Sequence, residues 1–85
     1  MSLIPPGSEV ISIRIEGDTA FINFNEDFQF NTFGVEGYTA QIIEVVFTAT
    51  DFPNINNVQI LIEGRRIDFL GEGIPIGIPL SRGMF

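Results

Sequence analysis

Near the start of the chain, apolar side chains occupy every second position on both sides of a short turn that contains a glycine. The alternating apolar residues are Ile11, Ile13, Ile15, Ala20, Ile22 and Phe24. This period of two predicts two half-buried strands, because successive side chains of a strand point to opposite faces. A two-residue turn over 16–17 pairs Ile15 with Asp18. Ile13 then faces Ala20, so both apolar sets lie on one side of the hairpin, and a four-residue loop would preserve that parity.

The stretch "QILIEGRRIDFLG" follows the same pattern further along the chain. A turn over 63–64 places Ile60 opposite Ile67 on one face. The same register places Val58 opposite Phe69. We therefore expect a second hairpin. A shared turn and a period of two are common to all one-sided hairpins, so they do not by themselves indicate an internal repeat.

Between the two hairpins, apolar residues recur at steps of three and four over residues 35–51. The stripe consists of Tyr38, Ile42, Val45, Val46 and Ala49, with Ile43 and Phe47 widening it. This spacing predicts an amphipathic helix of about four turns. Pro53 gives the helix a firm stop, and "PNINN" provides a turn before the next strand.

Proline and glycine mark both ends of the single domain that 85 residues allow. We expect this domain to span 1–85, with an extended lead-in over 1–8. In 72–85, Pro and Gly exclude a helix while the aliphatic residues require burial, which predicts an extended tail packed on the body. Ahead of the helix, a loop carries aromatic residues that we expect to cap one edge of the core, namely Phe28, Phe30 and Phe33.

Together these elements predict an α+β fold in which two β-hairpins form a four-stranded sheet with one helix packed on one face (ββαββ) and a Pro/Gly-rich tail. The face beneath the helix is expected to be lined by Ile11, Ile13, Ile22, Phe24, Val58, Ile60, Ile62 and Ile67. The opposite face would show an apolar cluster of Val10, Phe21, Leu61 and Leu70. Either the tail covers this cluster, which we favour, or it is a surface for a partner.

Charge and composition exclude several classes of partner and site. Eleven carboxylates against four arginines give a net charge of −7, so nucleic acid and an anionic membrane surface would be repelled. There is no cysteine for a disulfide or a thiolate metal site. No apolar run reaches the roughly 18–20 residues of a membrane span, so we expect no direct membrane insertion by this segment.

Catalytic chemistry is poorly provided for, because the chain has no His, Cys or Lys. Nucleophile schemes that depend on these residues are therefore impossible. A two-carboxylate glycosidase could use Glu63 with Asp68 or Glu72, although carboxylates at the end of a hairpin are usually solvated. We expect no cofactor and no metal, since "GEGIPIG" lacks the Lys and helix of a phosphate loop and "DFPNINN" lacks the ligand pattern of a calcium loop.

Three arginines and two apolar residues are the candidates for contact with a partner. Arg65 and Arg66 place adjacent positive charges at a hairpin tip, where they could bind a carboxylate or neutralise Glu63 and Asp68. Phe21 and Leu61 belong to the apolar cluster described above. Arg82 either pins the tail to a carboxylate, which we favour, or marks the passage to a following domain.

Three stretches of the chain, "LIPPGS", "VFTATDFPNINNVQILIEGRRIDFLGEGIP" and "PLSR", resemble the spore germination and sporulation (GerMN) domain. Members of that family look like "IPPG", a helix ending in "TxTxFPGV", a strand reading "VQxLxxG" and a closing "PLTR". Asn54 stands where the family usually has Gly, and "RGMF" replaces the acidic residue that commonly follows the Arg. The resemblance implies an extracytoplasmic bacterial module of a larger secreted protein or lipoprotein, linked to sporulation or germination.

We therefore expect a non-catalytic binding or assembly module of the cell envelope, lipid-anchored or secreted in the full-length protein. Its partner would be a neighbouring domain of the same chain, an envelope protein or a peptidoglycan-related ligand. The alternatives are a self-associating scaffold and, with less support, a cell-wall hydrolase. High negative charge favours a monomer, because copies repel one another.

Overall fold

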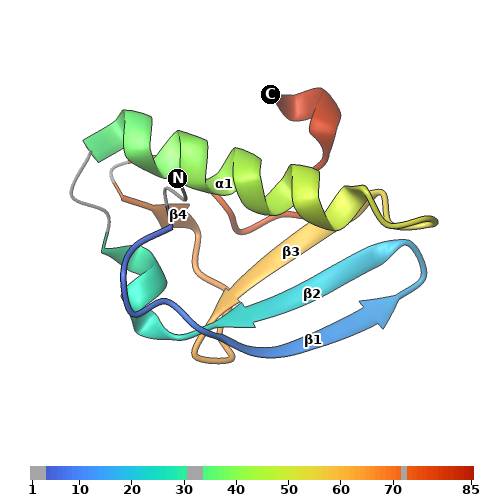
Figure 1. Ribbon diagram of the computed structural model, residues 1–85, viewed down its shortest axis with the longest axis horizontal. Helices are drawn as coiled ribbons and strands as arrows, with labels where there is room; N and C mark the ends of the chain where they lie inside the picture. The colour runs from blue at the N-terminus through green and yellow to red at the C-terminus, as the bar shows by residue number, and fades with distance from the viewer. Residues whose placement is uncertain (1–3, 31–33, 72) are drawn as a thin grey trace.

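A computed structural model describes residues 4–30, 34–71 and 73–85 of the chain. Figure 1 shows one long helix lying across a small twisted sheet, with the end of the chain returning beside the helix. The elements in chain order are β1 (Val10–Glu16), β2 (Thr19–Phe24), the 3-10 helix η1 (Glu26–Gln29), α1 (Gly34–Thr50), β3 (Asn57–Ile62), β4 (Phe69–Leu70), β5 (Ile74–Pro75) and the 3-10 helix η2 (Arg82–Met84).

The main sheet has three strands in the order β1-β2-β3, and β4 pairs with β5 in a separate two-stranded sheet. β1 and β2 are antiparallel, whereas β2 and β3 are parallel and are joined through α1. Parallel neighbours need a long crossover connection, and α1 with its flanking loops supplies one. The α+β class is confirmed in its coarse form, but the four-stranded sheet of two hairpins is wrong.

The first hairpin forms with a register two residues away from the one predicted. Its turn is Gly17–Asp18, and Ile15 pairs with Ala20, as the four-residue-loop alternative requires. Glu16 also pairs with Thr19, so the loop itself has only two residues. Gly17 has a φ of 61°, the left-handed conformation that the first central position of a type II′ turn requires. Both apolar sets still lie on one side, because a shift of two preserves parity.

The second hairpin forms only at its turn. Ile62 pairs with Arg65 around Glu63 and Gly64, which have φ values of 50° and 78°, as in a type I′ turn. The ladder does not continue to the predicted Ile60–Ile67 and Val58–Phe69 pairs. Instead, Val58 exchanges two backbone hydrogen bonds of 2.8 Å with Leu80 of the tail. The free edge of β3 is thus taken by the tail, and Phe69 pairs with Pro75.

The helix begins and ends within one residue of its predicted bounds and packs its apolar stripe on β2 and β3. Asn54, beyond its C-terminus, has a φ of 71°, a conformation that Asn tolerates better than most residues other than Gly. The core comprises Ala20, Ile22, Phe24, Phe28, Ile42, Val45, Val46, Val58, Ile60, Ile62, Leu70, Ile76 and Leu80. Five of the residues predicted beneath the helix are therefore buried. Ile11 and Ile13 are exposed and Ile67 is only half-buried, which corrects that prediction.

The tail packs on the body, as predicted, through the fully buried Ile76 and Leu80. It covers the back of β3, where the buried Gln59 side chain donates a hydrogen bond of 3.1 Å to the Ile76 carbonyl. Ahead of the helix, Phe28 enters the core and stacks on Phe24 with ring centroids 3.9 Å apart. Phe30 is exposed, contrary to its predicted capping role, and Phe33 lies outside the described residues.

Candidate functional site

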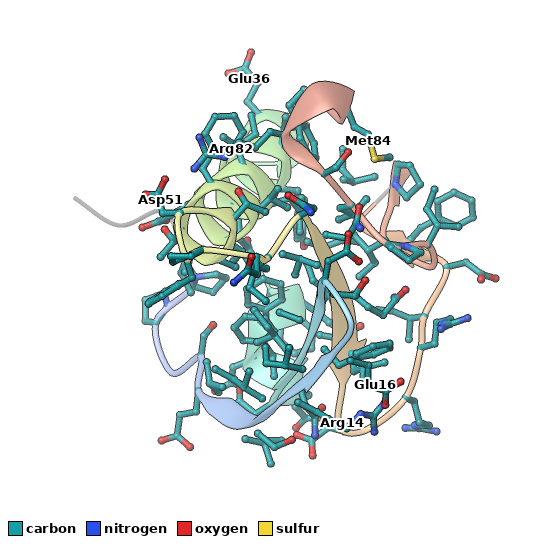
Figure 2. All side chains as sticks on the ribbon, turned by 90° about the vertical axis from the view of Figure 1, so that its right-hand side faces the viewer. Arg14, Glu16, Glu36, Asp51, Arg82 and Met84 are labelled. Atoms are coloured by element: carbon teal, nitrogen blue, oxygen red, sulfur yellow. The ribbon has the colours of Figure 1, made fainter. Side chains whose placement is uncertain are left out.

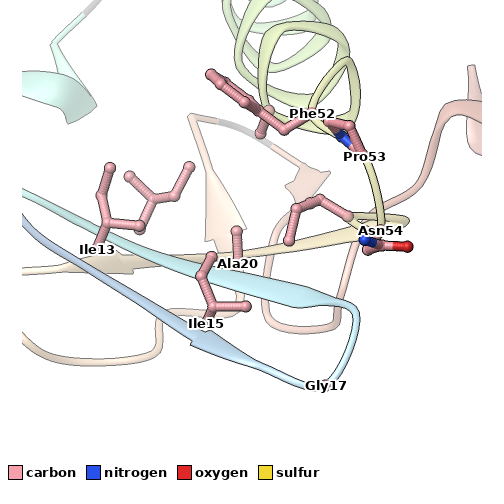
Figure 3. A pocket seen from close by; sticks show the side chains of 10 residues that line it. Ile13, Ile15, Gly17, Ala20, Phe52, Pro53 and Asn54 are labelled. Atoms are coloured by element: carbon pink, nitrogen blue, oxygen red, sulfur yellow. The ribbon is translucent and has the colours of Figure 1, made fainter.

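An apolar groove separates β1 from the C-terminal end of α1. It has a volume of about 490 Å³ and is lined by Ile13, Ile15, Gly17, Ala20, Ile22, Ala49, Phe52, Pro53, Asn54 and Ile55. Figure 3 shows Ile13 and Ile15 rising from the strand on one side and Phe52 lying on the other. These three side chains are 60%, 54% and 65% exposed, respectively, so a continuous apolar strip meets solvent here.

The groove continues along β1 towards the start of the strand. A second section of about 260 Å³ is lined by Ile4, Val10, Ile13, Ile22, Phe24, Glu44, Val45, Thr48 and Ala49. The two sections share Ile13, Ile22 and Ala49, so they form one surface that follows β1. We refer to both sections together as the β1 groove. Glu44 is the one charged side chain among its described lining residues.

The width of a helix explains why the groove is open. A helix with its side chains is about 10–12 Å across, and neighbouring strands lie about 4.8 Å apart, so one helix covers two strands well and a third poorly. α1 lies over β2 and β3, and β1 extends beyond it (Figure 1). Every residue of β1 is exposed as a result.

The sequence did not identify this groove, because the apolar face of the first strand was assigned to the core. The side of the sheet on which these residues lie was predicted correctly, since Ile13 pairs with the buried Ile22 on the helix side. The helix width was the available signal: one helix cannot bury a strand at the edge of a three-stranded sheet.

Arg65 and Arg66, two of the sequence candidates, are exposed in the turn that follows β3. Within the described residues neither of them forms an ion pair, so the predicted neutralisation of Glu63 and Asp68 is not seen. The turn itself is firmly held, because the Gly64 N–H donates a hydrogen bond of 2.7 Å to Asn23 Oδ1. Arg65 exchanges two backbone hydrogen bonds of 2.9 Å with Ile62 and therefore projects from a held turn, and Arg66 follows it.

Phe21 and Leu61 lie half-buried on the sheet face opposite the helix. The Arg14 guanidinium sits 4.6 Å from the Phe21 ring centroid and also pairs with Glu16 at 2.6 Å. The remaining members of the predicted cluster are elsewhere: Leu70 is buried in the core, and Val10 lines the β1 groove. The structure therefore does not assemble the apolar cluster expected on this face.

Arg82 clamps the tail to the C-terminal end of α1, which confirms the predicted pinning role. Its guanidinium donates hydrogen bonds to Thr50 Oγ1 at 2.7 Å and to the Phe47 carbonyl at 2.9 Å, and it pairs with Asp51. It also lies over the Phe47 ring, 4.7 Å from the centroid. Figure 2 shows Arg82 beside Asp51 at this helix end. A cation is favourable here because helix C-termini carry unpaired carbonyls and partial negative charge.

Of the carboxylates considered for catalysis, Glu63 makes a contact that stabilises the fold. Glu63 Oε2 accepts a hydrogen bond of 2.9 Å from the Glu26 N–H at the start of η1, so it satisfies an otherwise unpaired donor. Asp68 is exposed, and Glu72 lies outside the described residues. In the part of the chain that the structure describes, no group of three acidic residues is placed to hold a metal ion. No described helix combines the length and apolar character needed to cross a membrane.

The asparagines before β3 fasten the first hairpin turn. Asp18 accepts side-chain hydrogen bonds from Asn56 at 3.2 Å and Asn57 at 3.5 Å, and its carbonyl accepts the Asn56 N–H at 2.8 Å. The Asn56 side chain is the main cause that lowers the pKa of Asp18 below its ordinary value of 3.8. Asn54, with its positive φ, has the turn role that was predicted after the helix, whereas Asn56 and Asn57 hold a different turn, that of the first hairpin.

Asp18→Asn is expected to lower stability at neutral pH and to have less effect in acid. The lowered pKa means that the folded state favours the ionised carboxylate, so its contribution is present above about pH 4 and is lost as the pH falls through the folded-state pKa. Urea midpoints of the wild type and the variant should therefore converge towards about pH 2. Asp68→Asn controls for the loss of one surface charge, and a difference for Asp18→Asn that stays constant from pH 7 to pH 2 would contradict this role.

The comparisons with known proteins agree on one family. The family model named Germane, described as sporulation and spore germination, matches residues 1–68. A candidate lipoprotein from Clostridium perfringens is similar in structure, with a TM-score of 0.86 and 26% identity over 95% of this chain. This chain spans 54% of that one, about half its length. A search of curated proteins finds no significant match.

Two further similar structures come from the sporulation protein GerM of Bacillus subtilis. Its tandem GerMN domains match with a TM-score of 0.84 and 26% identity, over 98% of this chain and 29% of theirs. Its first GerMN domain alone matches with a TM-score of 0.81 and 26% identity, over 95% of this chain and 60% of its own. The structural likeness therefore includes the tail that the family model does not reach. With a family model matching residues 1–68 and the GerMN fold over nearly all of its length, the chain belongs to the Germane family of sporulation and spore germination domains.

Proposed function

We propose that this chain is a non-catalytic binding or assembly module that acts outside the cytoplasm, in the bacterial envelope. Membership of the sporulation and germination family and the likeness to a candidate lipoprotein support the location. The partner would be a neighbouring domain, an envelope protein or a peptidoglycan-related ligand. In the full-length protein, the module would be lipid-anchored or secreted.

The observation that carries the proposal is the β1 groove, an open apolar surface without an acid and base pair. Binding sites are mostly apolar with a few polar groups, whereas hydrolysis needs two groups with tuned pKa values in reach of one bond. Glu44 is the one charged residue among the groove's described lining, and the chain has no His, Cys or Lys. Such a surface suits recognition rather than turnover.

The arginine turn is a second candidate contact surface. Arg65 and Arg66 are exposed and form no ion pair among the described residues, so their charges are available to a carboxylate. Self-association through the outer edge of β1, which pairs with no strand among the described residues, is the alternative function, since an exposed edge strand can pair with another chain. A net charge of −7 opposes it, because each copy repels the next.

The purified domain is expected to release no soluble product from peptidoglycan and to retain specific proteins from a solubilised envelope extract. The first result follows from the lack of an acid and base pair, and the second from the exposed groove. Product release is measured by chromatography and retained proteins by mass spectrometry, with an immobilised protein of equal negative charge as control.

Product release that is abolished by Glu63→Gln would overturn the non-catalytic role. Glutamine keeps an oxygen acceptor for the Glu26 N–H, so this variant removes the ionisable group while preserving the contact that holds η1. Stable trimers or larger rings in light scattering would favour the scaffold alternative.

A further inference from the structure

The edge of β1 and its groove form one surface made by the same residues. Because a two-residue turn joins Glu16 to Thr19, this pair exchanges backbone hydrogen bonds, and the bonded pairs alternate along the hairpin. The peptide groups of Ile13 and Ile15 therefore point away from β2, out of the sheet edge. Their side chains line the groove. A strand added at this edge could form backbone hydrogen bonds with Ile13 and Ile15 and pack its apolar side chains against the side chains of the same two residues.

The usable length of this edge is set by features of the strand itself. A β-bulge between Val10 and Ser12 breaks the register at one end, and the turn at Gly17 ends it at the other. Native sheets protect their edges with charges, prolines or bulges. Between Ser12 and Glu16 the strand contains no proline or bulge, and charged side chains are its only protection against pairing. The regular edge between the bulge and the turn can therefore pair with a segment of about five residues, or roughly 17 Å.

Charge decides which kind of segment fits. Glu9 precedes β1, Glu16 and Asp18 close it, and Glu44 lines the groove. The one positive side chain of the strand is Arg14, which is on the opposite face, stacked on Phe21 and paired with Glu16. Among the described residues that line the groove, Glu44 is the one charged side chain, and the two ends of the strand are acidic. A second copy would bring another net −7 against it, which argues against self-pairing.

We propose that β1 binds an extended, positively charged polypeptide segment as a fourth strand, with every second side chain apolar and seated in the β1 groove. This mode of recognition takes affinity from main-chain hydrogen bonds and selectivity from alternate side chains. The inference rests on the proposed function and names the chemistry of the partner. Lysine or arginine between the apolar positions would lie on the other face of the added strand, on the side of Arg14 and Glu16. The attraction for a positively charged segment therefore comes from the net charge of −7 and from Glu9, Glu16 and Asp18 at the two ends of the strand.

The test uses a labelled peptide with valine at alternate positions and lysine between them, and a matched peptide with glutamate in place of lysine. Fluorescence anisotropy is expected to show binding of the lysine peptide and at least tenfold weaker binding of the glutamate peptide. In the bound state, hydrogen exchange of the Ile13 and Ile15 amides should slow, because these amides become hydrogen-bonded.

The protein variant is Ile13→Thr with Ile15→Thr, which keeps the charge and the strand propensity. It should weaken the lysine peptide by roughly tenfold through lost apolar contact. Ile11→Thr is the matched control, because Ile11 has similar exposure on the same strand but does not line the groove. Circular dichroism verifies that each variant is folded.

Equal affinity of the double variant and the wild type would overturn the inference, since only unspecific charge attraction would remain. Unchanged exchange of the two amides would exclude strand addition. If the wild type sediments as a dimer and the double variant as a monomer, the edge of β1 binds a second copy of the chain instead. The peptidoglycan assay does not involve β1, so each of these results leaves the non-catalytic role of the domain standing.

Discussion

Phe28→Ala is expected to destabilise the domain by about 3–5 kcal/mol. The Phe28 ring is fully buried and stacks on Phe24 at an interplanar angle of 15°. Truncation leaves a cavity between η1 and the sheet that the backbone cannot easily close, because the Phe28 carbonyl accepts a 2.6 Å hydrogen bond from Gln41 Nε2. A domain of 85 residues has a free energy of unfolding of only about 4–13 kcal/mol. Equilibrium unfolding in urea, followed by circular dichroism, measures the loss.

Phe30→Ala is the matched control for this substitution. Phe30 follows η1 directly, two residues after Phe28, but it is 64% exposed, so its truncation should change the free energy of unfolding by no more than about 0.5 kcal/mol. Similar losses for both variants would show that the loop as a whole, rather than the buried ring, determines stability. The sequence alone assigned the same role to both residues.

Local signals of the sequence predicted the individual elements well. Steps of three and four located the helix to within one residue, and Pro53 marked where it could not continue. The turn at Glu63 and Gly64 was placed correctly, and so was the side of the first hairpin on which Ile13 and Ile22 lie. Each of these features depends on side-chain period or turn chemistry within a few residues.

The pairing of distant segments could not be predicted in the same way. Both the segment "RIDFL" after the turn and the tail can pair with β3, and the outcome depends on which of the two gains more burial. In the structure, the tail pairs with the edge of β3, because Leu80 and Ile76 become fully buried in this arrangement. Phe69, which would have been the hairpin partner of Val58, stays exposed. A pattern of alternating residues does not rank these alternatives.

The candidate site was missed for a related reason. The sequence shows that Ile13 and Ile15 are apolar and face the helix side, and both statements hold. Whether they are buried depends on the strand order and on how far the helix extends across the sheet. Because β1 is at an edge and the helix covers β2 and β3, residues that read as core become an exposed surface.

Gly71→Ala is the second large effect, with an expected loss of about 2–5 kcal/mol in the free energy of unfolding. A Cβ at this position would lie 2.6–2.7 Å from the Tyr38 ring, well inside van der Waals contact. Tyr38 cannot readily move, because its hydroxyl donates a 2.6 Å hydrogen bond to the Gln29 carbonyl. Gly71 also has a φ of +61°, which adds about 1–2 kcal/mol of backbone strain for alanine. Urea unfolding again measures the total.

Gly64→Ala separates the two causes of this loss. Gly64 has a φ of +78° but no atom within 4 Å of the added Cβ, so it should show the backbone strain of about 1–2 kcal/mol alone. In a Tyr38→Ala background the ring is absent, and Gly71→Ala should then cost no more than Gly64→Ala does in the wild type. If Gly71→Ala remains equally costly without the Tyr38 ring, the close packing of β4 and β5 against the start of α1 is not the reason for glycine at this position.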